Sequence, residues 1–262
     1  VALRLLREGD LTDLRAAAPE LETLAFDDES RFVIGNSLGA EIATMVLAVE
    51  RGIAAGVLNV PPGSIIDNLV ESPEFRPLTE LLFLPVLGLR GPYDEPERGL
   101  ALDLFIDLMR FALEPSDPLA LAPFLLGDPV AEGAPPDLLV QLGGLDEVAA
   151  PRASEALVAA AGIPAAPALA LASGPEAELP AYENLSTPGG PVTAVCSRFP
   201  SGGHGMLEVR HQESRYEPPA LLPFSQRLEP VPFENPISEV HAQIEAFLRS
   251  RLEEGRARVD QM

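Results

Sequence analysis

A serine between two glycines is the first feature of this 262-residue sequence that suggests chemistry. The string Gly-Asn-Ser-Leu-Gly, residues 35–39, follows a short apolar run and comes directly before a helix-like stretch. The two glycines permit a sharp, strained turn that lifts the Ser37 hydroxyl above the end of a strand. The N–H groups of the following helix point to the same place, so the Leu38 amide is positioned to bind a developing oxyanion. The motif therefore predicts a nucleophile at Ser37.

A serine nucleophile needs a base to accept its proton, and the sequence has three histidines. His204 lies in the loop Ser-Gly-Gly-His-Gly, between a predicted strand and the final helix, where glycines allow a close approach to Ser37. His211 falls in a polar segment. His241 falls inside the last helix, where packing or solvent contact is the ordinary role. We therefore predict that His204 is the base, and the alternative is an exposed loop histidine.

The third residue should be a carboxylate that orients the imidazole and stabilises the imidazolium. Asp146 follows the predicted strand Leu-Leu-Val-Gln-Leu through a Gly-Gly turn. Glu147 is its neighbour, whereas Asp137 precedes the strand and so belongs to the opposite end of the sheet. A turn or helix-capping aspartate is the alternative role for Asp146. Its place in the chain between Ser37 and His204 favours the catalytic role.

Each of these three residues follows a predicted strand, and the strands alternate with predicted helices. Such alternation predicts an α/β fold with a parallel sheet, and the carboxyl ends of parallel strands carry the chemistry. The residues between 164 and 190 are predicted to be loop-rich. The predicted strands are 31–35, 55–60, 138–142 and 191–199, and the predicted helices are 1–14, 40–51, 152–161 and 237–252.

Two segments interrupt this pattern within a single predicted domain, residues 1–262. Residues 64–135 are apolar, helical in character and broken by prolines, which predicts a helical cap insertion. Residues 212–236 are proline-rich and predict a second, loop-like insertion. Apolar residues on the underside of the cap would line a pocket for an acyl or leaving group, although apolar residues at helical spacing are more often simply core.

The order Ser–Asp–His, each residue after its own strand, resembles the α/β-hydrolase superfamily. The matching segments are GNSLGA, LLVQLGGLDEVAAP and FPSGGHG followed by the helix EVHAQIEAFLRS. Within that superfamily, VLNVPPGSIIDNLVESPEF, preceded by GNSLGAEIATMVLAVE, is similar to bacterial extracellular lipases and esterases of the virulence-factor lipase type. The resemblance implies an ester substrate and an extracellular or cell-envelope location.

One departure from this superfamily concerns the strands that precede its nucleophile strand. The resemblance implies that they carry the loop with the second oxyanion donor, but residues 1–30 contain no such strands or glycine-rich loop. The chain therefore resembles the C-terminal part of such an enzyme, and we expect a missing N-terminal half or another chain to supply the rest. A half-sheet leaves an apolar strand edge bare, so we expect this chain alone to be a poor enzyme.

Composition excludes several other kinds of partner. The net charge of −22 repels phosphate backbones and anionic lipid headgroups, which argues against nucleic acid as a partner. The sequence contains no run of 18 or more apolar residues, so we predict no transmembrane helix and no stable membrane insertion. No metal-ligand spacing and no dinucleotide-binding motif occurs, so we expect no cofactor and no metal. The single cysteine, Cys196, is predicted to be a small buried residue of a strand.

Three functions are consistent with these features. The first is hydrolysis of a carboxylic ester through an acyl-enzyme, with Ser37 as nucleophile, His204 as base, Asp146 as acid and the Leu38 amide as oxyanion donor. The second is a serine peptidase on the same scaffold, which predicts a charged anchor for a peptide terminus in the cap, such as Arg76, Arg90 or Arg98. The third is a non-catalytic binding module that retains the scaffold.

Overall fold

The computed structural model describes most of the chain after residue 29. The described residues are 30–76, 79, 81, 85–86, 88, 96–127, 130, 133–166, 175–214 and 231–260. The predicted helix over residues 1–14 lies outside them.

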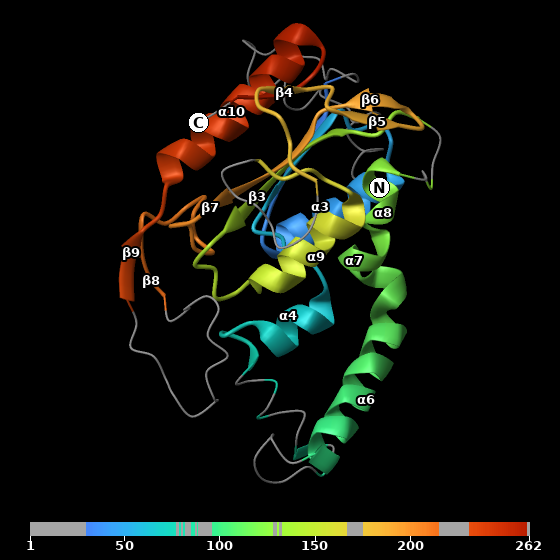
Figure 1. Cartoon of the computed structure of the whole chain (residues 1–262), viewed down its shortest axis with the longest axis vertical. Coiled ribbons are helices and arrows are strands. Elements are labelled where there is room, and N and C mark those ends of the chain that lie inside the picture. Colours follow the sequence, from blue (N-terminus) through green and yellow to red (C-terminus); the bar gives the residue numbers. More distant parts are fainter. Residues whose placement is uncertain are drawn as a thin grey trace, which may run out of the picture.

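Four parallel strands form the central sheet, in the order β1-β2-β3-β7 (Figure 1). They are β1 (Phe32–Asn36), β2 (Ala55–Asn59), β3 (Asp137–Gly143) and β7 (Ala194–Phe199). The predicted α/β fold class with a parallel sheet is therefore confirmed. The predicted strand 191–199 is wrong in one respect, because Thr193 separates β7 from the short strand β6 (Gly190–Val192). Thr193 donates its N–H to the Asp137 side chain instead of extending one strand.

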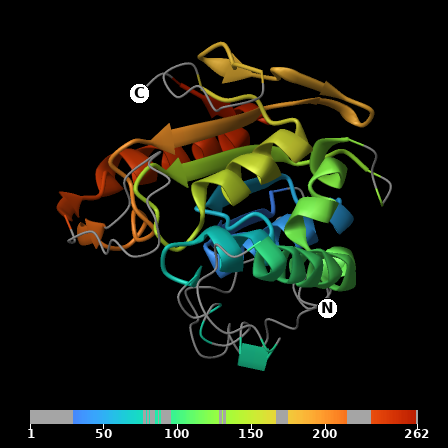
Figure 2. The same cartoon turned by 60° about the horizontal axis from the view of Figure 1, so that its bottom comes forward.

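Helices cover both faces of this sheet. Helices α3 (Leu38–Val49), α8 (Pro123–Leu126) and α9 (Pro151–Ala161) pack on one face, and α10 (Ile237–Glu254) packs on the other. Figure 2 shows α9 and α10 on opposite sides of the strands. Strand β3 contributes alternate side chains to the two faces because successive strand residues point in opposite directions. The β3 members of the α3–α9 core are Leu138, Val140 and Leu142, whereas Leu139 belongs to the α10 core.

A buried row of polar side chains crosses the sheet on the α10 side. Asn59, Gln141 and Ser197 are register partners on β2, β3 and β7. The Asn59 amide donates to Gln141 Oε1 (3.0 Å), and Gln141 Nε2 donates to Gln243 Oε1 of α10 (2.8 Å). Gln243 Nε2 in turn donates to Ser197 Oγ (2.7 Å). Because buried polar groups need partners, this row holds the strands in one register directly beneath the carboxyl end of the sheet.

The described residues between β2 and β3 are largely helical, and this segment is called the cap. Its helices are α4 (Ile65–Glu71), α6 (Pro96–Leu113), the 3-10 turn η2 (Glu114–Ser116), α7 (Pro118–Leu121) and α8. Ile66 of α4 packs against Leu102 and Ile106 of α6 in a small apolar cluster of its own. Other apolar side chains of α6 are exposed, namely Leu100, Leu104, Leu108 and Phe111.

Short strand pairs occur where the sequence predicted loops. They are β4 (Ala181–Tyr182) with β10 (Arg258–Val259), β5 (Leu185–Thr187) with β6, and β8 (His211–Ser214) with β9 (Val231–Glu234). The sequence predicted a loop-rich segment over 164–190 and a loop-like insertion over 212–236, and it did not locate the short strands that lie in them. Strands of two to four residues carry too little alternation for a sequence pattern to detect. Among the described residues, no helix is long and apolar enough to cross a membrane.

Candidate active site

The turn that carries Ser37 lies between β1 and α3. Ser37 has φ 53° and ψ −123°, a strained conformation for a non-glycine residue. A Cβ atom at Gly35 would lie 2.4 Å from the Gly39 carbonyl oxygen, so the close approach of strand and helix requires glycine at position 35. The Ser37 N–H donates to the Asn59 carbonyl at 3.0 Å, which anchors the turn to the next strand. Strand, turn and helix thus present the Ser37 hydroxyl at the carboxyl end of the sheet.

The other two predicted side chains reach this hydroxyl. Ser37 Oγ lies 2.7 Å from His204 Nε2, and His204 Nδ1 lies 3.1 Å from each oxygen of Asp146. The predicted trio is therefore brought together in one hydrogen-bonded chain. Two of the alternative residues lie elsewhere. Asp137 begins β3 at the opposite end of the sheet, and His241 contacts the Leu207 carbonyl.

Asp146 is held by its own loop. Its side chain is 2% exposed, and Oδ1 accepts the N–H groups of Val148 and Ala149, both at 2.8 Å. A carboxylate that accepts two backbone N–H groups is oriented by them and does not need to rotate when the imidazole acquires a proton. The capping role that the sequence offered as an alternative is thus combined with the contact to His204.

The loops that carry Asp146 and His204 lie against each other. The Leu145 N–H donates to the Gly202 carbonyl at 2.8 Å, and the Gly203 N–H donates to Asn235 Oδ1 at 2.7 Å. Asn235 is buried and precedes α10. Asn235 was not predicted from the sequence, and no local pattern marks it, because its partner lies 32 residues away.

Leu38, the predicted oxyanion donor, is the first residue of α3. The N–H groups of the first helical turn have no acceptor within the helix, and the positive end of the helix dipole lies at the same place. The Leu38 amide is therefore suited to bind an oxygen beside Ser37. Its side chain is 63% exposed.

A buried carboxylate lies one turn beyond Ser37 on the same helix. Burial, together with repulsion from Asp117, raises the pKa of Glu41 to about 7. Between pH 4.5 and 7 the folded chain therefore keeps a proton on Glu41 that the unfolded chain has released. Stability consequently falls as pH rises through this interval, and the penalty is complete above the folded-state pKa.

Replacing Glu41 by glutamine removes this penalty. We expect Glu41→Gln to raise the free energy of unfolding at about pH 8 by about 3 kcal/mol, since the pKa lies at about 7 instead of 4.5 and one pKa unit corresponds to about 1.4 kcal/mol, and to change it little at about pH 4. Urea unfolding at both pH values measures the difference. The exposed Glu253→Gln is the control and should change little at either pH. An equal effect of Glu41→Gln at both pH values would contradict the assignment.

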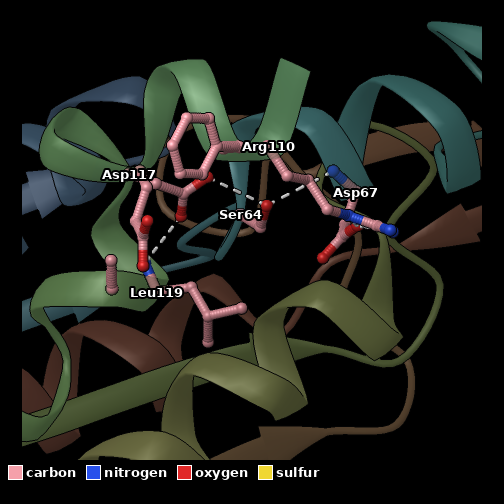
Figure 3. Close-up of a pocket in the computed structure, with 8 residues that line it drawn as sticks. Ser64, Asp67, Arg110, Asp117 and Leu119 are labelled. Carbon is pink, nitrogen blue, oxygen red and sulfur yellow. Dashed lines mark hydrogen bonds and ion pairs between the residues drawn. The ribbon is translucent and has the colours of Figure 1, made fainter. Parts of the chain in front are cut away.

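A cavity of about 360 Å³ lies between α4, α6 and α7, and both charged and apolar side chains line it. Figure 3 shows Ser64 between Asp117 and Asp67, with Arg110 above them. Ser64 Oγ donates to Asp117 Oδ2 at 3.0 Å, and Arg110 pairs with Asp67.

Of the charged anchors predicted for a peptide terminus, the structure tests Arg76, which does not line this cavity. Arg90 and the Arg98 side chain lie outside the described part of the chain. Arg110, which does line it, was not predicted from the sequence, because an arginine on a helix carries no local mark of a cavity.

The described ranges offer no metal centre. No group of three or more His, Cys, Asp or Glu side chains within them is arranged to hold a metal ion. Cys196 is buried in β7, and burial raises the pKa of its thiol well above the ordinary value. The thiol is therefore held in its neutral form, as expected for a packing residue.

Fold and site together define an α/β protein whose parallel sheet carries a hydrogen-bonded Ser–His–Asp trio. No protein-family model and no curated protein matches the sequence.

The chain is similar to several solved structures. A puromycin hydrolase is 18% identical over 74% of this chain and 22% of its own, with a TM-score of 0.39. The acylaminoacyl peptidase of Pyrococcus horikoshii is 15% identical over 74% and 23%, with a TM-score of 0.39. Acetyl xylan esterase 1 from Thermoanaerobacterium sp. is 18% identical over 73% and 46%, with a TM-score of 0.36. The chain thus spans less than half the length of each of these proteins.

Proposed function

We propose that this chain is the catalytic portion of a serine hydrolase that cleaves carboxylic esters, of the bacterial lipase and esterase kind that its motifs resemble. The observation that carries the proposal is the continuous chain of contacts from Ser37 Oγ through the His204 imidazole to the Asp146 carboxylate. This arrangement is suited to making a hydroxyl nucleophilic near neutral pH.

The proposed reaction runs through an acyl-enzyme. Ser37 Oγ attacks the ester carbonyl while His204 Nε2 takes the hydroxyl proton, and the Leu38 amide binds the oxyanion. The tetrahedral intermediate collapses, the ester C–O bond breaks, and His204 returns the proton to the leaving alcohol. Water then repeats the sequence on the acyl-enzyme, releasing the acid and restoring Ser37. Asp146 stabilises the imidazolium in both halves.

A fluorophosphonate probe tests this proposal without knowledge of the substrate. We expect one covalent adduct per chain, seen as a single mass increment of the intact protein, and no adduct on a folded Ser37→Ala variant. A folded parent that takes no label would favour the non-catalytic binding module.

The peptidase alternative gains one specific observation. The cap cavity contains the Arg110–Asp67 pair beside Asp117, and paired charges of both signs suit a peptide terminus better than a plain acyl chain. Hydrolysis of p-nitrophenyl esters of increasing acyl length, compared with a panel of short peptides, separates the two functions. Ester turnover without peptide turnover supports the leading proposal.

We also propose that a further polypeptide segment, from an N-terminal half or another chain, pairs with the outer edge of β1. No described strand pairs with that edge, and Ile34 on it is 52% exposed. Leu38, Ile42 and Val49 extend an exposed apolar stripe along α3. Such an edge favours strand pairing. Light scattering measures whether the chain self-associates through this edge, and a fluorophosphonate assay compares its labelling rate with that of a longer chain that includes an N-terminal half. A chain that stays monomeric at high concentration and is labelled as fast as the longer chain contradicts the proposal.

A further inference from the structure

The loop that carries Asp146 is held from outside by the first helix of the cap. The backbone N–H groups that orient the Asp146 carboxylate belong to Val148 and Ala149. The residues flanking this pair, Glu147 and Ala150, each bind the segment formed by α4 and the turn after it. Any displacement of α4 therefore moves the backbone on which the carboxylate rests.

Three hydrogen bonds make this connection. Asn68 Oδ1 accepts the Ala150 N–H at 2.7 Å. Ser72 Oγ donates to the Glu147 carbonyl at 2.7 Å, and the Glu74 N–H donates to the same carbonyl at 3.1 Å. Two of the three use a side chain, so they depend on residue type and can be removed one at a time.

Burial makes these contacts costly to lose. Asn68 is 6% exposed and Ser72 is fully buried. Without the Asn68 side chain, the buried Ala150 N–H loses its hydrogen-bond acceptor, and water reaches this position poorly. An unpaired buried donor is costly, so the loop is expected to rearrange. A shift of about 1 Å in a catalytic group can cost about 100-fold in rate.

The other side of α4 faces the rest of the cap. Ile66 packs with Leu102 and Ile106 of α6, and Ser64 at the start of α4 donates to Asp117, which caps α7. Helix α4 is thus a rigid link with cap contacts at one side and the Asp146 loop at the other.

We propose that Asn68 and Ser72 are positioning residues that couple the cap to the acid of the trio, so that a change in cap packing alters the alignment of His204. This inference rests on the proposed serine hydrolase function for its catalytic consequence. The structural consequence, which is the placement of Asp146 against His204, holds whether or not the chain is a hydrolase.

The first experiment measures the fluorophosphonate labelling rate against pH for matched variants. Asn68→Ala is expected to lower the rate about tenfold and to move the acid limb of the pH profile to lower pH, because a displaced carboxylate no longer stabilises the imidazolium. Ser72→Ala is expected to act in the same direction, about threefold, because the Glu74 N–H still holds the Glu147 carbonyl. Asn68→Asp and Ser72→Thr, which keep the acceptor and the hydroxyl, should restore most of the rate.

Thr187→Val is the matched control. Thr187 Oγ1 donates to the Gly190 carbonyl at 2.6 Å, a hydroxyl bond within the β5–β6 pair, which involves neither α4 nor the Asp146 loop. The substitution should lower thermal stability and leave the labelling rate and the pH profile unchanged. Folded Asn68→Ala protein with the parent's rate and profile would overturn the inference, as would an equal effect of Thr187→Val.

A second measurement does not depend on catalysis. With three histidines in the chain, the imidazole resonances of His204 can be assigned with His204→Gln and followed by NMR. The His204 resonances should shift in Asn68→Ala and stay in place in Thr187→Val. If the parent takes no label, the function proposal fails while this spectrum still decides the positioning inference, and an unmoved His204 resonance rejects it.

Discussion

An Asp146→Asn variant is expected to lose about 10³–10⁴-fold in the rate of ester hydrolysis and of fluorophosphonate labelling while remaining folded. The amide oxygen of the new side chain can still accept the hydrogen bonds that the N–H groups of Val148 and Ala149 donate to Asp146 Oδ1 at 2.8 Å. Its NH2 group then faces His204 Nδ1. Two donors cannot share that contact, so the imidazole places its proton on Nε2, where it cannot accept the proton of Ser37.

The control for this prediction is the neighbouring acid. Glu147→Gln should retain the rate within about threefold, because the imidazole of His204 contacts the oxygens of Asp146. Initial rates with a short p-nitrophenyl ester and a thermal melt of each variant are sufficient. More than a tenth of the parent's rate in folded Asp146→Asn, or a larger loss in Glu147→Gln, would show that the acid has been misassigned.

At the opposite end of β3, Asp137→Ala is expected to lower the free energy of unfolding by about 3–4 kcal/mol. Asp137 is buried and accepts the N–H groups of Thr193 (2.8 Å) and Ala257 (3.1 Å), and Arg251 lies 3.2 Å from its second oxygen. Burial raises the pKa of Asp137, so the charge is costly to bury. Removing it is costlier, because two buried donors and a guanidinium then lose their acceptor.

Urea unfolding at about pH 7 measures this loss. Asp137→Asn, which keeps one acceptor oxygen, should lose about half as much, and the exposed Asp103→Ala should change stability by less than about 0.5 kcal/mol. Because Asp137 lies at the end of β3 away from Asp146, the labelling rate of the folded fraction should be unaltered. A stable Asp137→Ala protein would mean that the C-terminal segment is not anchored through this carboxylate.

The sequence alone predicts the features that depend on neighbours in the chain. The strand, the glycine-flanked turn at Ser37 and the helix beginning at Leu38 follow from local composition, because only glycine permits the close approach at position 35. Alternation of strands with helices predicts the parallel sheet, and topology then places the ends of β1, β3 and β7 along one edge. That is sufficient to nominate Ser37, Asp146 and His204.

The tertiary structure alone decided the contacts between distant segments. Ser37 and His204 are 167 residues apart, and Asp146 and His204 are 58 apart, so neither distance follows from any local pattern. The same holds for Asn68, whose partner Ala150 lies 82 residues away. Periodicity shows which face of an element is buried, but a buried polar side chain takes whichever partner the packing of the elements brings within about 3 Å.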